Sequence, residues 1–166
     1  MADQIITQEY LHELFEYRDG CLYWKIQNSN RVNIGNEAGY LDEKNSRKSV
    51  RIDGKLYLVH RIIFMMHYGY FPRLVDHKDT NSLNNKIHNL RDASKGENAY
   101  NSKIPKTNTS GAKGVSWYKK QNKWHVKLKV NGKTMHFGYY NDIDYAVFVA
   151  DAMRYKYHGK FANNGK

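Results

Sequence analysis

Apolar residues in the first part of the chain switch between helical and strand-like spacing. Thr7 can cap a helix whose apolar stripe runs to about Tyr17. Four short strands are expected after it, at residues 21–26, 37–41, 49–52 and 55–59. The run from His60 to Tyr68 is apolar at helical spacing and Gly69 follows it, which predicts a second helix.

The C-terminal part has a different pattern. Three strands are expected, at residues 114–119, 124–130 and 133–140. The last two are joined by Asn131-Gly132, a strong signal for a two-residue hairpin turn. Asp142 can then cap a helix to about His158, and its expected apolar face comprises Ala146, Val149, Ala150, Met153 and Tyr157. These elements predict a three-stranded antiparallel sheet with one helix packed against it.

The segment between these two patterns is poor in large apolar residues. Residues 102–113 are rich in Pro, Gly, Ser, Thr and Asn, which is typical of a linker. We therefore predict an α+β protein of two domains. Residues 1–105 form the first domain, with its core at about 55–105; residues 106–112 form the linker; and residues 113–166 form the second domain.

The net positive charge of the chain indicates a polyanionic partner. The chain carries 27 Lys and Arg against 16 Asp and Glu, a net charge of +11. The excess lies late in the chain, because residues 1–50 hold 6 basic and 8 acidic groups while residues 106–166 hold 12 and 3. Such a balance indicates binding to nucleic acid, although a merely soluble basic surface is the simpler reading.

Other compositional features limit the class of protein. The single cysteine, Cys21, excludes an internal disulfide and a paired-cysteine zinc site, which fits a reducing cytosol. No apolar run approaches the ~20 residues that cross a bilayer, and the N-terminus lacks a signal-peptide pattern. We therefore expect a cytoplasmic protein with no membrane contact.

Residues 76–98 hold the groups that hydrolysis of a phosphodiester requires. His77 can act as a general base because imidazole titrates near neutral pH. Asp76 offers a hard carboxylate oxygen and Asn98 an amide oxygen, and a magnesium site often uses only one or two protein oxygens. Adjacent strand residues point to opposite faces, so a twisted or bulged strand must bring Asp76 and His77 to one site.

Several residues near this segment have two possible roles each. Asn89 can hold the loop, or it can donate to or accept from the His77 ring and fix its tautomer. Arg61 and Arg91 can each contact phosphate or form a structural ion pair. His60 can lie near the site, but a core or capping histidine is the more common case. An isolated Asp-His pair is usually an ordinary turn, so only the whole spacing supports a nuclease.

The second predicted sheet has one open polar face. Val126, Leu128 and Val130 point towards the helix, so His125, Lys127 and Lys129 point away from it. Ser116, Tyr118, Thr134 and His136 share that open face. A basic ribbon with aromatic edges fits the major groove of DNA, whereas a solvated lysine face is the alternative.

The first region resembles the HNH family of nucleases. The resemblance rests on V-H-R-I-I (59–63), V-D-H (75–77), N-N-K-I-H-N-L-R (84–91) and E-N-A-Y-N (97–101). It implies a ββα-metal fold, also called a His-Me finger, built around one Mg²⁺ or Mn²⁺ ion. By the same resemblance His77 is the general base, Asp76 and Asn98 bind the metal, and Asn89 is the middle, structural asparagine. Asn98 stands where many members have His, which leaves the preferred metal open.

The second region resembles AP2-type DNA-binding domains. This resemblance rests on G-V-S-W-Y (114–118), K-W-H-V-K-L (123–128), F-G-Y-Y (137–140) and A-V-F-V-A-D-A (146–152). It implies DNA contacts by Lys113, Ser116, Tyr118, Lys127, Lys129, Thr134 and His136. The plant members have arginines and tryptophans at several of these positions, so their sequence preference does not transfer. An HNH unit followed by an AP2-like unit is similar to phage homing endonucleases.

These observations lead to one main hypothesis and two rivals. The main hypothesis is a metal-dependent endonuclease of duplex DNA, of the phage homing type, that nicks or cleaves its target as a monomer or weak dimer without an obligate protein partner. The first rival is a sequence-specific DNA-binding regulator on a catalytically dead HNH scaffold. The second is a structural RNA-binding protein, which would bind RNA more tightly than duplex DNA.

Overall fold

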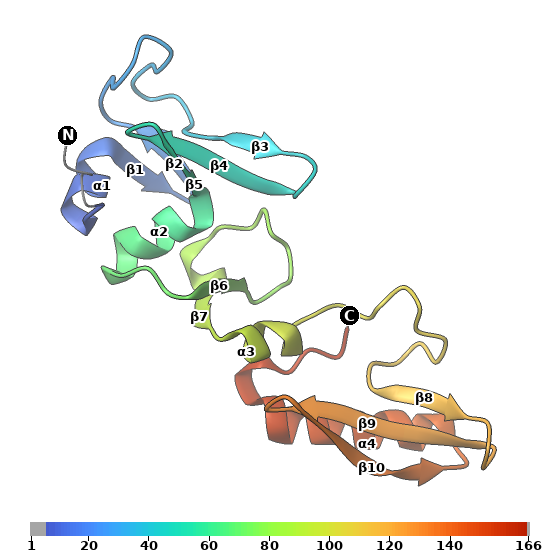
Figure 1. Cartoon of the computed structure of the whole chain (residues 1–166). Coiled ribbons are helices and arrows are strands. Elements are labelled where there is room, and N and C mark those ends of the chain that lie inside the picture. The colour runs from blue at the N-terminus through green and yellow to red at the C-terminus, as the bar shows by residue number, and fades with distance from the viewer. Residues whose placement is uncertain (1–5, 166) are drawn as a thin grey trace. The chain divides into compact units, whose positions relative to one another are not determined.

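The computed structural model describes residues 6–165, and these divide into two compact units between Ala93 and Ser94 (Figure 1). The division lies before the predicted linker at 106–112, because the helix that follows Ser94 makes its contacts with the C-terminal unit. The predicted domain limits stay a prediction. None of the helices within residues 6–165 is long and apolar enough to span a bilayer.

The N-terminal unit opens with a short helix and a hairpin. Helix α1 (Gln8–Leu14) begins at Thr7, whose hydroxyl accepts a hydrogen bond from the backbone N–H of Tyr10 at 3.2 Å. The helix predicted to run to Tyr17 is shorter than expected, since Phe15 is already extended. Strands β1 (Phe15–Arg18) and β2 (Cys21–Trp24) pair across the Asp19-Gly20 turn, and this pairing stops the helix.

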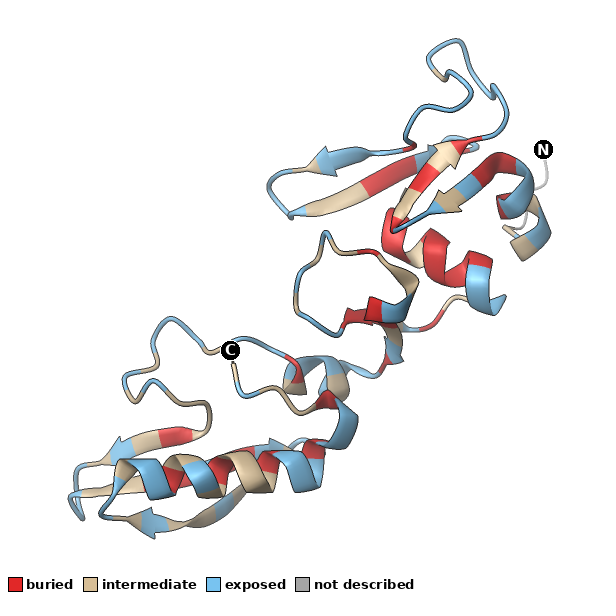
Figure 2. Cartoon of the chain, turned by 180° about the vertical axis from the view of Figure 1, so that it is seen from behind, coloured by how far each residue is buried: buried red, intermediate tan, exposed pale blue. Residues whose placement is uncertain are grey.

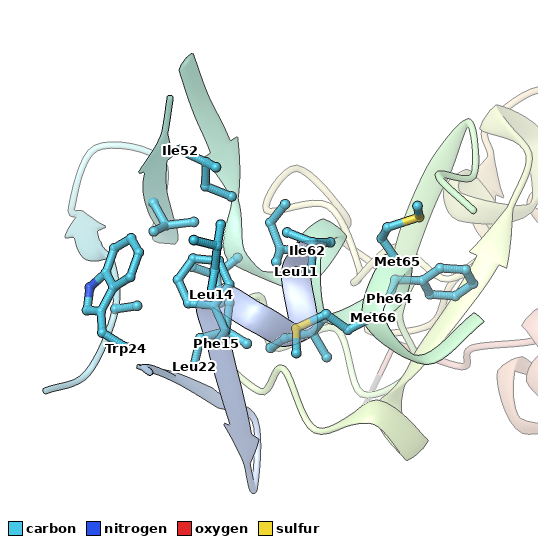
Figure 3. Packing of buried hydrophobic residues seen from close by; sticks show 14 of the residues in the cluster. Leu11, Leu14, Phe15, Leu22, Trp24, Ile52, Ile62, Phe64, Met65 and Met66 are labelled. Carbon is cyan, nitrogen blue, oxygen red and sulfur yellow. The ribbon is translucent and has the colours of Figure 1, made fainter. Parts of the chain in front are cut away.

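A three-stranded antiparallel sheet and a buried helix complete the core of this unit. The sheet contains β3 (Tyr40–Asp42), β4 (Arg47–Ile52) and β5 (Lys55–Leu58) in that order. Helix α2 (Val59–Tyr68) follows directly and ends at Gly69, which has the left-handed conformation that favours glycine. Side chains of α1, β2, β4 and α2 meet in one cluster that includes Leu11, Leu22, Ile52 and Ile62 (Figure 3).

A second hairpin stands against α2. Strand β6 (Leu74–His77) pairs with β7 (Leu90–Ala93), and the loop between them ends in the 3₁₀ turn η1 (Ile87–Asn89). Val75 and Leu90 join the core that α2 forms, so the hairpin is fixed at its apolar face. Tyr17 extends the anchoring to the loop, because its hydroxyl oxygen accepts a hydrogen bond from the N–H of Ile87 at 3.0 Å.

The C-terminal unit begins with helix α3 (Lys95–Tyr100), which Ser94 and Glu97 close with a reciprocal capping box. Its three-stranded sheet has the order β10-β9-β8, and α4 (Ile143–His158) covers one face. The strands are β8 (Val115–Tyr118), β9 (Lys123–Val130) and β10 (Lys133–Tyr140). The 3₁₀ turn η2 (Gly159–Phe161) follows α4. These strands and the helix capped by Asp142 lie where the sequence predicts them.

The buried face of α4 differs in part from the expected one. Ala146 and Ala150 are buried as predicted, but Arg154 and His158 continue the buried stripe (Figure 2). Tyr157 is instead 36% exposed. The buried residues of α4 recur every four positions from Ala146 to His158. This spacing brings the polar side chains of Arg154 and His158 against the sheet.

Candidate active site and nucleic-acid interface

Strand β6 places Asp76 and His77 inside the N-terminal unit. Their cross-strand partners on β7 are Arg91 and Leu90, and the pairing is regular antiparallel. Asp76 is 5% exposed and His77 is 6% exposed. The two side chains therefore lie in a largely water-excluded environment, where electrostatic interactions are stronger than in bulk water.

Asn85 holds the imidazole of His77. The side-chain oxygen Oδ1 of Asn85 lies 2.9 Å from Nε2 of His77, and Asn85 is 2% exposed. Because a carboxamide oxygen only accepts hydrogen bonds, Nε2 carries the proton and the neutral ring has its lone pair on Nδ1. The ring thus has the tautomer of a base that acts through Nδ1.

Burial also keeps the His77 ring neutral. Desolvation lowers the pKa of His77, and the positive charge of Arg47 lowers it further. The hydrogen bond to Asn85 and the nearby carboxylates of Asp79 and Asp76 act in the opposite direction, but burial dominates. An imidazole that is unprotonated at neutral pH is ready to accept a proton.

His60 packs against this ring from helix α2. The two ring centroids are 5.1 Å apart in an edge-to-face arrangement. Burial, followed by the charges of His77, Arg47 and Arg61, lowers the pKa of His60 to about 3. Both readings of His60 are therefore correct, since it is a neutral core histidine and it also forms one wall of the candidate site.

Asp76 is oriented by an ion pair. Its Oδ2 atom accepts hydrogen bonds from Nε and Nη2 of Arg91, each at 2.7 Å. Arg91 therefore forms the structural ion pair that was one of its two readings. Arg61 donates to the backbone carbonyl of Pro72 at 2.9 Å, which ties α2 to the chain that enters β6.

Asn89 holds the loop between the strands. Its Nδ2 group donates to Oδ1 of Asp79 at 2.9 Å and to the carbonyl of Asn84 at 2.7 Å, and its Oδ1 atom accepts from the N–H of Asp79 at 3.1 Å. Asn89 therefore holds the loop, which was the first of the two roles considered for it. Asn85, which the sequence reading missed, holds the His77 ring instead.

Asn98 lies on α3, which belongs to the C-terminal unit, and its side chain is exposed. Its predicted role as a second metal ligand stays a prediction. Ser94 caps this helix.

The donor set suits a hard cation more than zinc. Within the described residues there is no group of three or more His, Cys, Asp or Glu side chains that could hold a metal. A closed protein cage is therefore not formed by these residues. One carboxylate fits the way Mg²⁺ is commonly bound, with phosphate oxygens and water completing the coordination. Carboxylate oxygens have several lone pairs, so Asp76 can bind Arg91 and a cation together.

The open face of the C-terminal sheet carries most of the residues predicted to contact DNA. Lys127 and Lys129 are exposed, and Thr134 and His136 lie directly opposite Lys129 and Lys127 on β10. On the other side of β9, Ser116 lies opposite His125. The predicted alternation therefore places these side chains on one face, as expected.

A β-bulge brings Tyr139 to this face, although strict alternation of side chains along β10 would not predict it there. The register shifts between His136 and Gly138, so that Tyr139 pairs with His125. The rings of Tyr139 and His125 stack with centroids 4.5 Å apart, and Tyr118 lies 5.2 Å from Tyr139. The signal available in the sequence was the Phe137-Gly138 step within the strand; in the structure Gly138 has a φ of 113°.

Lys113 differs from the other predicted DNA contacts. Its ammonium group donates to the backbone carbonyls of Tyr100, Ser102 and Asn163. Burial and then the charge of Arg154 lower the pKa of Lys113 to about 8. Its three donor hydrogens thus serve to hold the C-terminal unit together.

Comparison with known proteins supports the first of the two resemblances. The HNH endonuclease family matches residues 57–100, which include Asp76, His77, Asn85 and Asn89. The chain is 38% identical to Protein 3.8 of Escherichia phage T7 over 94 residues, which represent 57% of this chain and 74% of the phage protein. No solved structure matches the chain. The chain therefore belongs to the family of this phage protein and carries an HNH endonuclease domain.

Proposed function

We propose that this protein is a metal-dependent endonuclease that hydrolyses phosphodiester bonds of duplex DNA. The observation that carries the proposal is a pair of consecutive residues on β6, where Asn85 holds the imidazole of His77 and Arg91 holds the carboxylate of Asp76. Both lie within the stretch that matches the HNH endonuclease family. The proposal rests on this donor set rather than on any bound ligand.

His77 acts as the general base in the proposed reaction. Nδ1 takes a proton from a water molecule as the water oxygen forms a bond to phosphorus and the bond from phosphorus to the 3′ oxygen breaks. The hydrogen bond from Nε2 to Asn85 keeps the ring in the required tautomer during this transfer. Burial favours return of the ring to its neutral form.

Asp76 is the proposed protein ligand of a divalent cation, Mg²⁺ or Mn²⁺, with Asn98 as the second ligand expected from the sequence. When bound, the cation supplies positive charge next to the scissile phosphate and the leaving oxygen. Arg91 limits the rotation of the Asp76 carboxylate and so fixes the direction in which it presents its oxygens.

The C-terminal unit is the proposed DNA-binding element, in the manner of AP2-like domains. Its support is the open sheet face with Lys127, Lys129 and His136, together with the basic balance of residues 106–166. Lysine contacts phosphate as a point charge, so this face should bind DNA with limited sequence discrimination. With one candidate site per chain, a monomer of this homing-type enzyme should nick one strand.

The test is incubation of supercoiled plasmid with the protein and Mg²⁺, beside His77→Ala and Asp76→Asn. Asp76→Asn keeps a hydrogen-bond acceptor for Arg91 but leaves its buried charge uncompensated, so circular dichroism of this variant must show that it is folded under the assay conditions. Relaxed circles with the native protein and not with either variant support the enzyme. Tight DNA binding without strand scission by the native protein would instead favour the non-catalytic regulator, and preference for RNA in a competition gel would favour the RNA-binding protein.

A further inference from the structure

The outer side of helix α4 carries a row of exposed aromatic residues. Tyr145, Phe148 and Tyr155 are 56%, 67% and 77% exposed, although the other side of the helix is buried against the sheet. The rings of Tyr145 and Phe148 contact each other, with centroids 6.2 Å apart. Single exposed apolar side chains are common, but several large ones gathered on one side of a helix indicate an interaction surface.

The row has the spacing of a coiled-coil seam. Its members, which we call the α4 seam, are Tyr145, Phe148, Ala152 and Tyr155. Their separations of three, four and three residues match the a, d, a and d positions of successive heptads. At 3.6 residues per turn the four positions lie within about 80° of one another, on the side of α4 opposite to the buried Ala150. The seam is therefore placed to pack against a second helix.

Charged residues flank the seam in an arrangement that is complementary to a second copy of the chain. In heptad notation Asp144 and Asp151 occupy g positions on one side, and Val149 and Lys156 occupy e positions on the other. In a parallel pair of helices, a g residue lies beside the e residue that comes five positions later in the other helix. Asp151 of each copy would therefore lie beside Lys156 of the other copy, and the contact would occur twice by symmetry.

We propose that the α4 seam binds the seam of a second copy of this chain, so that two α4 helices form a short parallel coiled-coil dimer. The interface is isologous, because each seam residue meets its own copy across a twofold axis that runs along the helices. An antiparallel pair would instead bring g positions beside g positions, and so Asp151 towards acidic residues of the other copy. Like charges across an interface disfavour that orientation.

A dimer through α4 leaves the proposed DNA-binding face open. Helix α4 covers one face of the C-terminal sheet, and Lys127 and Lys129 project from the other. Each copy can therefore contact DNA while its seam is occupied, a consequence that rests on the proposed function, whereas the dimer itself does not. A seam of four residues buries little area, so the dimer should be weak, with a dissociation constant in the micromolar to submillimolar range.

The first test is sedimentation velocity of the full-length protein without DNA, at concentrations up to the millimolar range. Moderate salt is needed, because a net charge of +11 on each chain opposes association when it is not screened. We expect an equilibrium between monomer and dimer. A monomer over the whole range would overturn the inference. Since no DNA is present, this result is independent of the proposed nuclease activity, which the plasmid assay measures separately.

Variants of exposed aromatic residues test whether the seam is the interface. Phe148→Ser and Tyr155→Ser should each weaken dimerization about tenfold or more, because truncation of a central aromatic side chain typically has an effect of this size. Both side chains are exposed, so the fold should be retained. Tyr139→Ser is the matched control, because Tyr139 is 40% exposed on the opposite face of the same sheet, and it should change dimerization less than about twofold. Equal effects of all three variants would overturn the inference.

A charge reversal tests the flanking contacts. Lys156→Glu places an acidic residue beside Asp151 of the other copy, so it should weaken the dimer about threefold or more. Lys133→Glu makes the same change of net charge at an exposed position of β10 outside the seam, and it should not weaken the dimer. An equal or stronger dimer with Lys156→Glu would contradict the parallel arrangement.

A single introduced cysteine tests the orientation directly. The native thiol is first removed by Cys21→Ser, and Ala152→Cys or Lys133→Cys is then added. A parallel seam places residue 152 opposite its own copy, so Ala152→Cys should give a disulfide-linked dimer under mild oxidation, whereas Lys133→Cys should remain largely monomeric. In an antiparallel pair centred on the seam, residue 152 would face Phe148 instead. Equal cross-linking of the two proteins, or none with Ala152→Cys, would overturn the proposed parallel dimer.

Discussion

The imidazole of His77 and the carboxamide of Asn85 form a buried pair, with Nε2 and Oδ1 2.9 Å apart. This contact sets the ring tautomer, so Asn85 is a positioning residue for the proposed base. We expect Asn85→Leu to lower the nicking rate by about 10–100-fold, the usual effect of removing a hydrogen-bond partner that orients a reacting group. DNA affinity should change less than twofold, because Asn85 is buried and the proposed DNA contacts are made by side chains of the C-terminal sheet.

Asn85→Asp separates positioning from packing. A carboxylate can accept the same hydrogen bond from Nε2, so this variant should recover most of the activity that Asn85→Leu loses. Single-turnover nicking and a DNA-binding titration on both variants give the measurement. Equal activity of Asn85→Leu and the native protein would show that the ring needs no such partner.

The Asp76–Arg91 ion pair should be a large contributor to stability. Both side chains are largely buried, and removal of one member leaves the other charge uncompensated. We expect Arg91→Met to lower the free energy of unfolding by about 3–5 kcal/mol. Exposed pairs contribute little, so Lys86→Met, which removes the exposed pair with Asp19, should leave the free energy of unfolding nearly unchanged. Urea unfolding measures the free energy of unfolding of both variants. Similar losses would mean that the buried pair contributes no more to stability than the exposed pair does.

The elements that could be predicted from the sequence are those whose signals are local. The turn at Asn131-Gly132 and the cap at Asp142 fix the bounds of β10 and α4 within the C-terminal unit. The predicted end of α1 was wrong, because Phe15 and Tyr17 fit an apolar helical stripe as well as they fit a strand. Pairing with β2 decides between the two, and that contact is not local.

The candidate site shows the same limit. His77 and Asp76 could be identified by spacing, but their partners could not. Asn84 and Asn85 are adjacent in one loop, and only the path of the loop decides which of them reaches the ring. Tyr139 was missed because strict alternation assumes a regular strand, whereas the bulge before Gly138 moves it to the open face.

Lys127 and Lys129 should account for part of the salt dependence of DNA binding. Each phosphate contact that a lysine makes releases condensed counterions and contributes about 0.9 to the slope of log K against log salt. The double variant Lys127→Ala with Lys129→Ala should therefore reduce the slope by about 2 and weaken binding broadly across sequences. The control is Lys156→Ala with Lys160→Ala, at the end of α4 and in η2. A loss confined to one sequence would instead make the two lysines base readers.

His60 should make the N-terminal unit less stable in acid. Its pKa is about 3 in the folded protein, and an unfolded histidine has a pKa of about 6.5. The unfolded state therefore binds more protons between these values, and the stabilisation that is fully present above pH 6.5 is lost as the pH falls towards 3. Between pH 7.5 and 5.0 this residue should account for a loss of about 2 kcal/mol.

The comparison is between the native protein and His60→Gln, which cannot titrate in this range. Native-state hydrogen exchange of α2 amides at the two pH values reports the local free energy of opening. The variant is expected to be less stable at pH 7.5 but to lose about 2 kcal/mol less on acidification. Parallel losses in both proteins would show that another group is responsible.

Gly114 and Gly132 share a φ angle of 80° but differ in their surroundings, which makes them a matched pair. A Cβ atom on Gly114 would lie 2.7 Å from Cδ2 of Leu128 and 2.9 Å from the carbonyl oxygen of Lys127, whereas one on Gly132 would meet nothing within 4 Å. Both alanine variants bear the cost of a left-handed residue, about 1–2 kcal/mol. Gly114→Ala should lose about 1–3 kcal/mol more, because the backbone carbonyl of β9 cannot yield as a flexible side chain can. Thermal unfolding of the two variants measures the difference, and equal melting temperatures would mean that the strand relaxes around the added methyl group.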